Sequence, residues 1–197
     1  MTDDDSPART LVSHDGTGMK IDPDTLHWLT TLNEPMFVLA VVGPMRSGKS
    51  TLLNSLFGST AFATSACIAS CTRGIQVKRV SLADPESGDD VPVLLLDVEG
   101  FGSPEAHAAT REAQLFALTA LLSSVTLYNS FGLVDERAIQ RLAALTSVAS
   151  QLMEGTDGST PGAAAHGRRS LEEMPKLVWL LRDFSFELSD DTVTGHT

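Results

Sequence analysis

The sequence has few cysteines, few basic residues and no long hydrophobic segment, and each shortage excludes a class of protein. Two cysteines in 197 residues do not make a disulfide framework, and nothing resembles a set of zinc ligands. Lys and Arg number 14 against 25 Asp and Glu, a net charge of −11, which argues against nucleic acid or an anionic membrane as the main partner. The longest mostly apolar segment, 113–125, is interrupted by Thr and Ser and is too short to cross a bilayer.

The N-terminus also lacks a targeting signal. The opening residues, MTDDDSPART, have neither the basic start nor the apolar run of a signal peptide. We therefore expect a soluble, cytoplasmic protein that binds no nucleic acid. The five histidines are scattered along the chain, and we expect no metal-binding or nucleophilic role for them.

What the sequence does contain is an ordinary globular composition, with 42% hydrophobic and 20% charged residues. Its length predicts a single domain with a substantial core. Residues 1–20 are polar and are expected to form a mobile leader. The folded domain is then expected to cover residues 21–197.

Apolar runs and segments of helical spacing alternate along the chain. Residues 35–43 and 91–100 are continuous apolar runs, as expected for strands buried on both faces of a parallel sheet. Residues 154–170 are rich in Gly, Ala and Ser and are expected to form a loop. The alternation predicts an α/β fold of three layers, α/β/α, around a mainly parallel sheet. The other expected elements are strands at 74–82, 124–130 and 176–184 and helices at 22–34, 49–58, 103–123 and 135–153.

The segment GPMRSGKS, residues 43–50, matches the phosphate-loop pattern G-x-x-x-x-G-K-[ST] between a predicted strand and a predicted helix. This context predicts a P-loop NTPase fold. Lys49 is expected to bridge the terminal phosphates of a nucleotide, and Ser50 to offer its hydroxyl to Mg²⁺. The expected nucleotide contacts in this segment are Gly43, Arg46, Ser47, Gly48, Lys49, Ser50 and Thr51.

Arg46 is the unusual residue of this loop. A loop that only binds phosphate has Lys49 and its backbone amides and needs little more. A second cation is useful where negative charge develops as the terminal phosphate is cleaved. Arg46 is therefore a candidate for catalysis as well as for binding.

An acidic turn follows the second apolar run. Asp97 ends the run and is expected to hold Mg²⁺, directly or through water. Gly100 allows close backbone approach, so its N–H is a candidate contact of the γ-phosphate. Two roles are open for Glu99, which either organises the attacking water or forms an ion pair with a neighbour.

Two further candidates lie at opposite ends of the predicted site. Thr72 lies between the phosphate-loop helix and the next strand, where a Thr can reach Mg²⁺ and release it after hydrolysis. Asp183 ends the last predicted strand, and one carboxylate can accept both the ring N–H and the amino group of guanine. The alternative for Asp183 is a surface ion pair with Arg182. The common guanine-reading motif N-K-x-D is absent.

About residues 20–190 resemble the large GTPases of the guanylate-binding protein family, with the atlastins as related proteins, in the dynamin superfamily. The arginine inside the phosphate loop and the Arg-Asp pair in place of N-K-x-D are the most specific features. The resemblance rests on segments in the family's order: EPMFVLAVVGPMRSGKSTLLN, SCTRGIQV, VLLLDVEGFGS, LYNSFGLVDERAIQRL and PKLVWLLRDFSFEL.

The resemblance implies roles for individual residues. Arg46 would be an internal arginine finger, and Ser70 would help to position the attacking water. Thr72 would be the switch threonine that closes on Mg²⁺. Asp183 would read guanine beside Arg182. The remaining matches are Lys49 and Ser50 at the phosphates and Mg²⁺, and Asp97 and Glu99 in the D-x-E-G switch.

The resemblance also implies partners and limits. GTP and GDP are the expected ligands, and a homodimer formed through GTP-loaded domains is the expected assembly. Any membrane association is expected to use regions absent from this chain, since family members continue beyond the point where it ends. Cys71, which precedes Thr72 where relatives vary, receives no role.

The expected activity is Mg²⁺-dependent hydrolysis of GTP by in-line attack of water. Two other functions stay open at this point. One is a module that binds GTP and docks a partner without efficient hydrolysis. The other is a kinase that transfers phosphate to a small acceptor, which the D-x-E-G turn and the Arg-Asp strand end disfavour.

Overall fold

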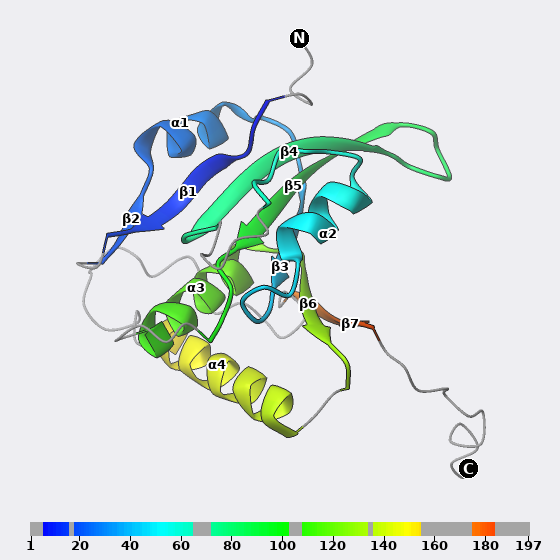
Figure 1. Cartoon of the computed structure of the whole chain (residues 1–197). Coiled ribbons are helices and arrows are strands. Elements are labelled where there is room, and N and C mark those ends of the chain that lie inside the picture. The colour runs from blue at the N-terminus through cyan, green and yellow to red at the C-terminus, as the bar shows by residue number, and fades with distance from the viewer. Residues whose placement is uncertain are drawn as a thin grey trace, which may run out of the picture.

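The computed structural model is built around one sheet with helices on both faces (Figure 1). Three segments with sequence-based predictions lie outside the described residues: Ser70 with both cysteines, the start of the helix expected at 103–123, and all but the first residue of the loop expected at 154–170. The structure describes residues 6–15, 18–64, 72–102, 108–133, 136–154 and 175–183.

The sheet has seven strands in the order β2-β1-β4-β5-β3-β6-β7. Four neighbours, β5, β3, β6 and β7, are parallel, whereas β4 runs antiparallel to β5. The difference follows from the connections, because a short turn joins β4 to β5 while longer crossovers join the parallel strands. The strands are β1 (Arg9–His14), β2 (Met19–Ile21), β3 (Phe37–Val42), β4 (Ile75–Ala83), β5 (Asp90–Val98), β6 (Val125–Phe131) and β7 (Lys176–Arg182).

The helices cover the sheet in the expected three-layer arrangement. Along β3, Ala40 and Val42 join a core with Phe116 of α3, whereas Val41 joins a second core with Leu53 of α2. Because strand side chains alternate between faces, α2 and α3 must cover opposite faces. Figure 1 shows α3 and α4 side by side, away from α2. The helices are α1 (Pro23–Thr31), α2 (Lys49–Leu56), α3 (Ala108–Leu122) and α4 (Glu136–Glu154).

The predicted α/β class with a parallel central sheet is thus confirmed, and local signals account for many boundaries. The side chain of Asp22 caps α1 by accepting the Thr25 N–H at 2.8 Å, and Pro23 occupies the first turn, where it has no N–H to lose. None of the helices in the described part of the chain is long and apolar enough to cross a membrane.

The segment expected to be a mobile leader differs from that expectation. Residues 9–14 and 19–21 form β1 and β2, and β1 extends the sheet by pairing with β4. Leu11 and Val12 of β1 are buried in the core. The polar composition of residues 1–20 concealed this short strand, because its stability comes from β4, which lies far along the sequence.

Gly74 marks a close approach between β1 and the start of β4. Its φ of +84° is left-handed, and a Cβ built there would collide with the carbonyl oxygen of Val12. Gly88, in the β4–β5 turn, has a similar φ of +75° but open space around it. A side chain at either glycine would strain the backbone, but only a side chain at Gly74 would also collide with a neighbour.

We predict that Gly74→Ala destabilises the protein clearly more than Gly88→Ala. Both alanines carry the left-handed penalty of about 1–2 kcal/mol. Only Gly74→Ala adds overpacking against β1, worth a further 1–3 kcal/mol or so. Urea unfolding of both variants measures the difference, and equal losses would contradict the close approach of β1 to Gly74.

Candidate functional site

The carboxyl ends of β3, β5 and β7 meet at one rim of the sheet, where parallel strands place ligand sites. Phe101, just after β5, donates its N–H to Gly43 O at 3.0 Å and accepts the Met45 N–H at 2.8 Å. Arg182, at the end of β7, donates to Ser47 O at 3.0 Å. The turn after β5 and the end of β7 are therefore both hydrogen-bonded to the loop that follows β3.

The loop from Gly43 to Gly48 has the backbone of an anion cradle. Gly43 and Gly48 have φ values of +145° and +77°, and side chains there would collide with Asn129 and Arg182. Gly48 caps α2 without a side-chain hydrogen bond, so the first amides of α2 stay available to a ligand. Arg46 is exposed and has a left-handed φ of +60°, rare for a residue with a side chain.

Lys49 is buried beneath this loop. Its ammonium donates to Pro44 O at 3.2 Å, which holds the side chain along the loop. Burial lowers the pKa of Lys49, while the nearby carboxylates of Asp97 and Glu99 raise it. A Cβ on Gly100 would lie 2.9 Å from the Lys49 ammonium, so the turn after β5 closes over this cation. Thr51, in the first turn of α2, is exposed.

Asp97 accepts hydrogen bonds from two hydroxyls that belong to separate segments. Its Oδ2 accepts from Ser50 Oγ at 2.6 Å and from Thr72 Oγ1 at 2.7 Å. Its Oδ1 is buried and has no hydrogen-bond partner within the described ranges. Burial raises the pKa of Asp97, against the two hydroxyls and Lys49, which lower it. A carboxylate beside two hydroxyls is the hard-oxygen donor set that suits a divalent cation such as Mg²⁺.

Glu99 lies next to this cluster but faces other partners. One carboxylate oxygen accepts the Gly74 N–H at 2.8 Å and contacts His14 Nε2 at 2.9 Å. The other contacts Arg111 Nη2 at 3.3 Å. Of the two roles left open by the sequence, the ion pair is present in the structure.

The candidate guanine reader lies at the far end of the rim. Asp183 is exposed and has a φ of +54°. The guanidinium of Arg182 lies 5.4 Å from the centre of the Phe131 ring and bonds the phosphate loop instead. The alternative of an Arg182–Asp183 ion pair is not realised among the residues that the structure describes.

Three site residues escaped the sequence analysis: Asn129, His14 and Arg111. Asn129 Nδ2 donates to Ser47 O at 2.7 Å and to Ser47 Oγ at 3.2 Å, which joins β6 to the phosphate loop. A polar amide inside the strand expected at 124–130 was the available signal for Asn129. Neither His14 nor Arg111 carries such a signal, because each meets Glu99 only through the fold.

The burial of Asp97 has a consequence for stability. Its folded pKa lies above the ordinary value of 3.8, so its charge opposes folding at neutral pH. We predict that Asp97→Asn stabilises the ligand-free chain at pH 7. This gain should shrink as the pH falls, because wild-type Asp97 becomes neutral as the pH passes below its raised pKa.

Asp84 provides the matched control of opposite sign. Backbone N–H groups of Glu86 and Ser87 lower the pKa of this exposed carboxyl, so its charge favours folding. Asp84→Asn should therefore destabilise the chain at pH 7, and this loss should also fade at acid pH. Urea unfolding at several pH values gives both curves, and a less stable Asp97→Asn at pH 7 would contradict the assignment.

Comparison with known proteins places this chain in a family. Residues 16–196 match the family model described as guanylate-binding protein, N-terminal domain. Guanylate-binding protein 5 of Mus musculus is 34% identical over 174 residues, which are 88% of this chain and 28% of that protein. Guanylate-binding protein 1 of Homo sapiens is 31% identical over 183 residues, 92% of this chain and 30% of that protein.

A solved structure is also similar, a dimerization-deficient mutant of Toc33 from Arabidopsis thaliana. It has a TM-score of 0.41 and 21% sequence identity, over 64% of this chain and 50% of that chain. The chain spans less than a third of the length of the curated relatives given above. The family model and these relatives show that the chain belongs to the guanylate-binding protein family.

Proposed function

We propose that this chain is a GTP-binding domain that hydrolyses GTP with Mg²⁺ and with its own arginine. The observation that carries the proposal is the convergence of Ser50, Thr72 and Asp97 beside the phosphate loop. A phosphate loop alone binds many nucleotides. A loop whose helix hydroxyl, switch hydroxyl and strand-end carboxylate meet at one point is suited to cleaving a metal-bound triphosphate.

Ser50, Thr72 and Asp97 would hold Mg²⁺. The hydroxyls of Ser50 and Thr72 lie 3.4 Å apart and share one oxygen of Asp97, while the other oxygen has no partner in the described part of the chain. When bound, Mg²⁺ would neutralise charge on the β- and γ-phosphates. Thr72, which bonds Asp97 in the structure, would turn toward the bound ligand as a switch residue does.

The phosphates would lie along the loop, against the free amides of α2 and the Lys49 ammonium. The amide of Gly100 would face the γ-phosphate. Support for this comes from the space around Gly100, which is so close to Met45 Cα and Lys49 Nζ that no side chain fits there. Glu99 would act on water beside the γ-phosphate, together with Ser70, which lies outside the described residues.

Asp183 would select guanine. Its carboxylate is exposed at the rim, and Arg182 is engaged by Ser47 and Phe131 rather than by Asp183. Guanine offers a ring N–H and an amino group that one carboxylate accepts together. Adenine lacks this pair and would leave the carboxylate without a partner, so ATP should be rejected.

Arg46 would supply the catalytic cation. Its left-handed backbone and exposure place it on the outside of the loop. It would therefore have to move toward the γ-phosphate to stabilise the charge that develops there. We propose that a second GTP-loaded copy of the domain, docked on this rim, drives that movement and forms the homodimer expected from the family.

We predict that Arg46→Ala keeps GTP affinity but loses most turnover, by roughly a thousandfold or more. The reason is that the finger acts on charge that appears only in the transition state. Nucleotide titration and single-turnover hydrolysis measure the two quantities. Lys49→Ala should instead abolish binding, since Lys49 meets the ground-state phosphates.

Lys176 offers a matched control for the loss of one positive charge. It is exposed at the start of β7, the opposite end of that strand from Arg182. Lys176→Ala should change neither affinity nor turnover. Unchanged turnover in Arg46→Ala would contradict the role of Arg46 as the catalytic cation.

We predict that Asp183→Asn exchanges guanine preference for xanthine preference. An Asn amide offers one donor and one acceptor, which match the C2 carbonyl and ring N–H of xanthine. Competition of GTP, XTP and ATP for the wild type and the variant measures this exchange. Equal affinity of the wild type for GTP and ATP would overturn the guanine assignment.

A further inference from the structure

The carboxylate of Glu99 is held by donors from three separate elements. Gly74 N–H, at the start of β4, and His14 Nε2, at the end of β1, both meet Oε2, at 2.8 and 2.9 Å. Arg111 Nη2, on α3, meets Oε1 at 3.3 Å. None of these donors belongs to the phosphate loop or to the cluster around Asp97.

The network is enclosed. The side chains of Glu99, His14 and Arg111 are only 9%, 11% and 14% exposed. The backbone of Glu99 is fixed as well, because its N–H donates to Gly74 O at 2.8 Å. Glu99 and Gly74 are therefore linked twice, through backbone and through side chain, with His14 on the same carboxylate oxygen.

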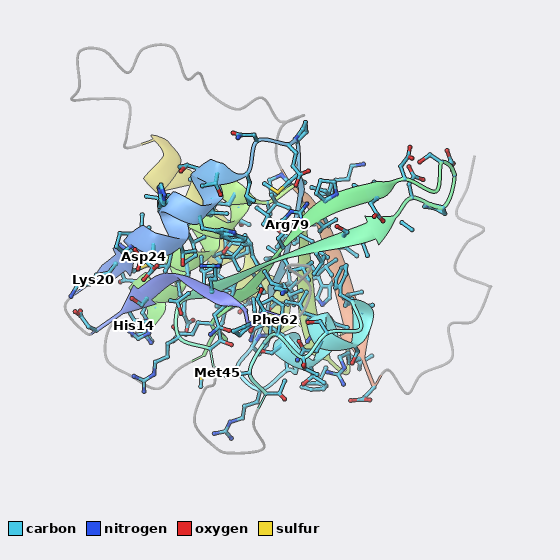
Figure 2. All side chains as sticks on the ribbon, turned by 90° about the horizontal axis from the view of Figure 1, so that it is seen from above. His14, Lys20, Asp24, Met45, Phe62 and Arg79 are labelled. Carbon is cyan, nitrogen blue, oxygen red and sulfur yellow. The ribbon has the colours of Figure 1, made fainter. Side chains whose placement is uncertain are left out.

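The position of His14 is set by the sheet and not by local chemistry. Strand β1 pairs with β4 through Val12 and Ile75, and Gly74 lets the two backbones approach closely. These contacts carry the last residue of β1 past the start of β4 to the turn after β5. Figure 2 labels His14 and Met45, a residue of the phosphate loop, on the same side of the molecule.

The two side-chain contacts of Glu99 are unequal. The His14 contact is 2.9 Å, a good hydrogen-bond length, whereas the Arg111 contact is 3.3 Å. His14 and the Gly74 amide contact the same carboxylate oxygen of Glu99, and Gly74 lies two residues after Thr72. His14 is thus the side chain best placed to hold Glu99 in register with the segment that carries Thr72.

We propose that His14 is a positioning residue for GTP hydrolysis, which holds the Glu99 carboxylate against Gly74 and so fixes it relative to Thr72 and the γ-phosphate. This inference rests on the proposed function, in which Glu99 acts on the attacking water. A glutamate has three side-chain torsions, and a carboxylate that samples several of them is seldom aligned with water. His14 removes that freedom without touching the nucleotide.

The test compares His14→Ala, His14→Gln and His27→Ala in the 197-residue chain. Gln keeps a donor at similar reach, whereas His27 is an exposed histidine on α1 whose backbone carbonyl accepts the hydroxyl of Thr30. We expect His14→Ala to lower kcat for GTP by about 10- to 100-fold, with KM nearly unchanged. His14→Gln should recover most of the loss, and His27→Ala should match the parent.

The Glu99→Ala background tests whether His14 acts through Glu99. If His14 acts through Glu99, His14→Ala should add no further loss of kcat in the Glu99→Ala background. An equal loss in both backgrounds would overturn the proposal, as would an unchanged kcat or a change confined to KM in His14→Ala. Thermal unfolding of each variant checks that the lost turnover is not lost folding.

Amide hydrogen exchange at Gly74 separates this proposal from the proposed function. His14→Ala should speed exchange at Gly74, because its N–H then bonds a mobile carboxylate, while His27→Ala should not. Unchanged exchange at Gly74 in His14→Ala would overturn the positioning role even if the parent chain hydrolyses GTP as proposed. A parent chain that binds but does not hydrolyse GTP, or full turnover in Glu99→Ala, would instead contradict the proposed function.

Discussion

The carboxyl group of Asp97 organises this rim because it is buried and, among the described residues, only one of its two oxygens has hydrogen-bond partners. It pairs in register with Val41 of β3 and Gln76 of β4, so it occupies the middle of the sheet. From there it binds the hydroxyl of Ser50 on one side and that of Thr72 on the other. The helix after the phosphate loop and the segment before β4 are aligned on this one group, and Lys49 supplies the compensating charge.

The sequence predicted the parts of the molecule whose signals are local. The apolar runs before Gly43 and Asp97 predicted the buried parallel strands, and Asp22, the N-cap of α1, is of a residue type favoured at that position. The meeting of the strand ends was also predictable, since parallel strands end at the same edge. These inferences needed only periodicity, caps and the direction of the strands.

The contacts that escaped prediction all depend on segments far apart in the chain. Strand β1 is short and polar at both ends, and only its pairing with β4 reveals it. The contact of His14 with Glu99 joins residues separated by 85 positions, and that of Asn129 with Ser47 joins residues separated by 82. No pattern within a window of the sequence encodes such pairs, because their geometry is set by sheet order.

Arg46 and Asp183 share a property that links the two ends of the site. Among the described residues, they alone have a side chain and a left-handed φ, and they occupy the proposed catalytic and base-reading positions. Glycine would relax the backbone at both places, so each side chain is kept at a cost of about 1–3 kcal/mol in stability. A screen that rewards only thermal stability should therefore favour glycine at these positions and produce chains that fold better and work worse.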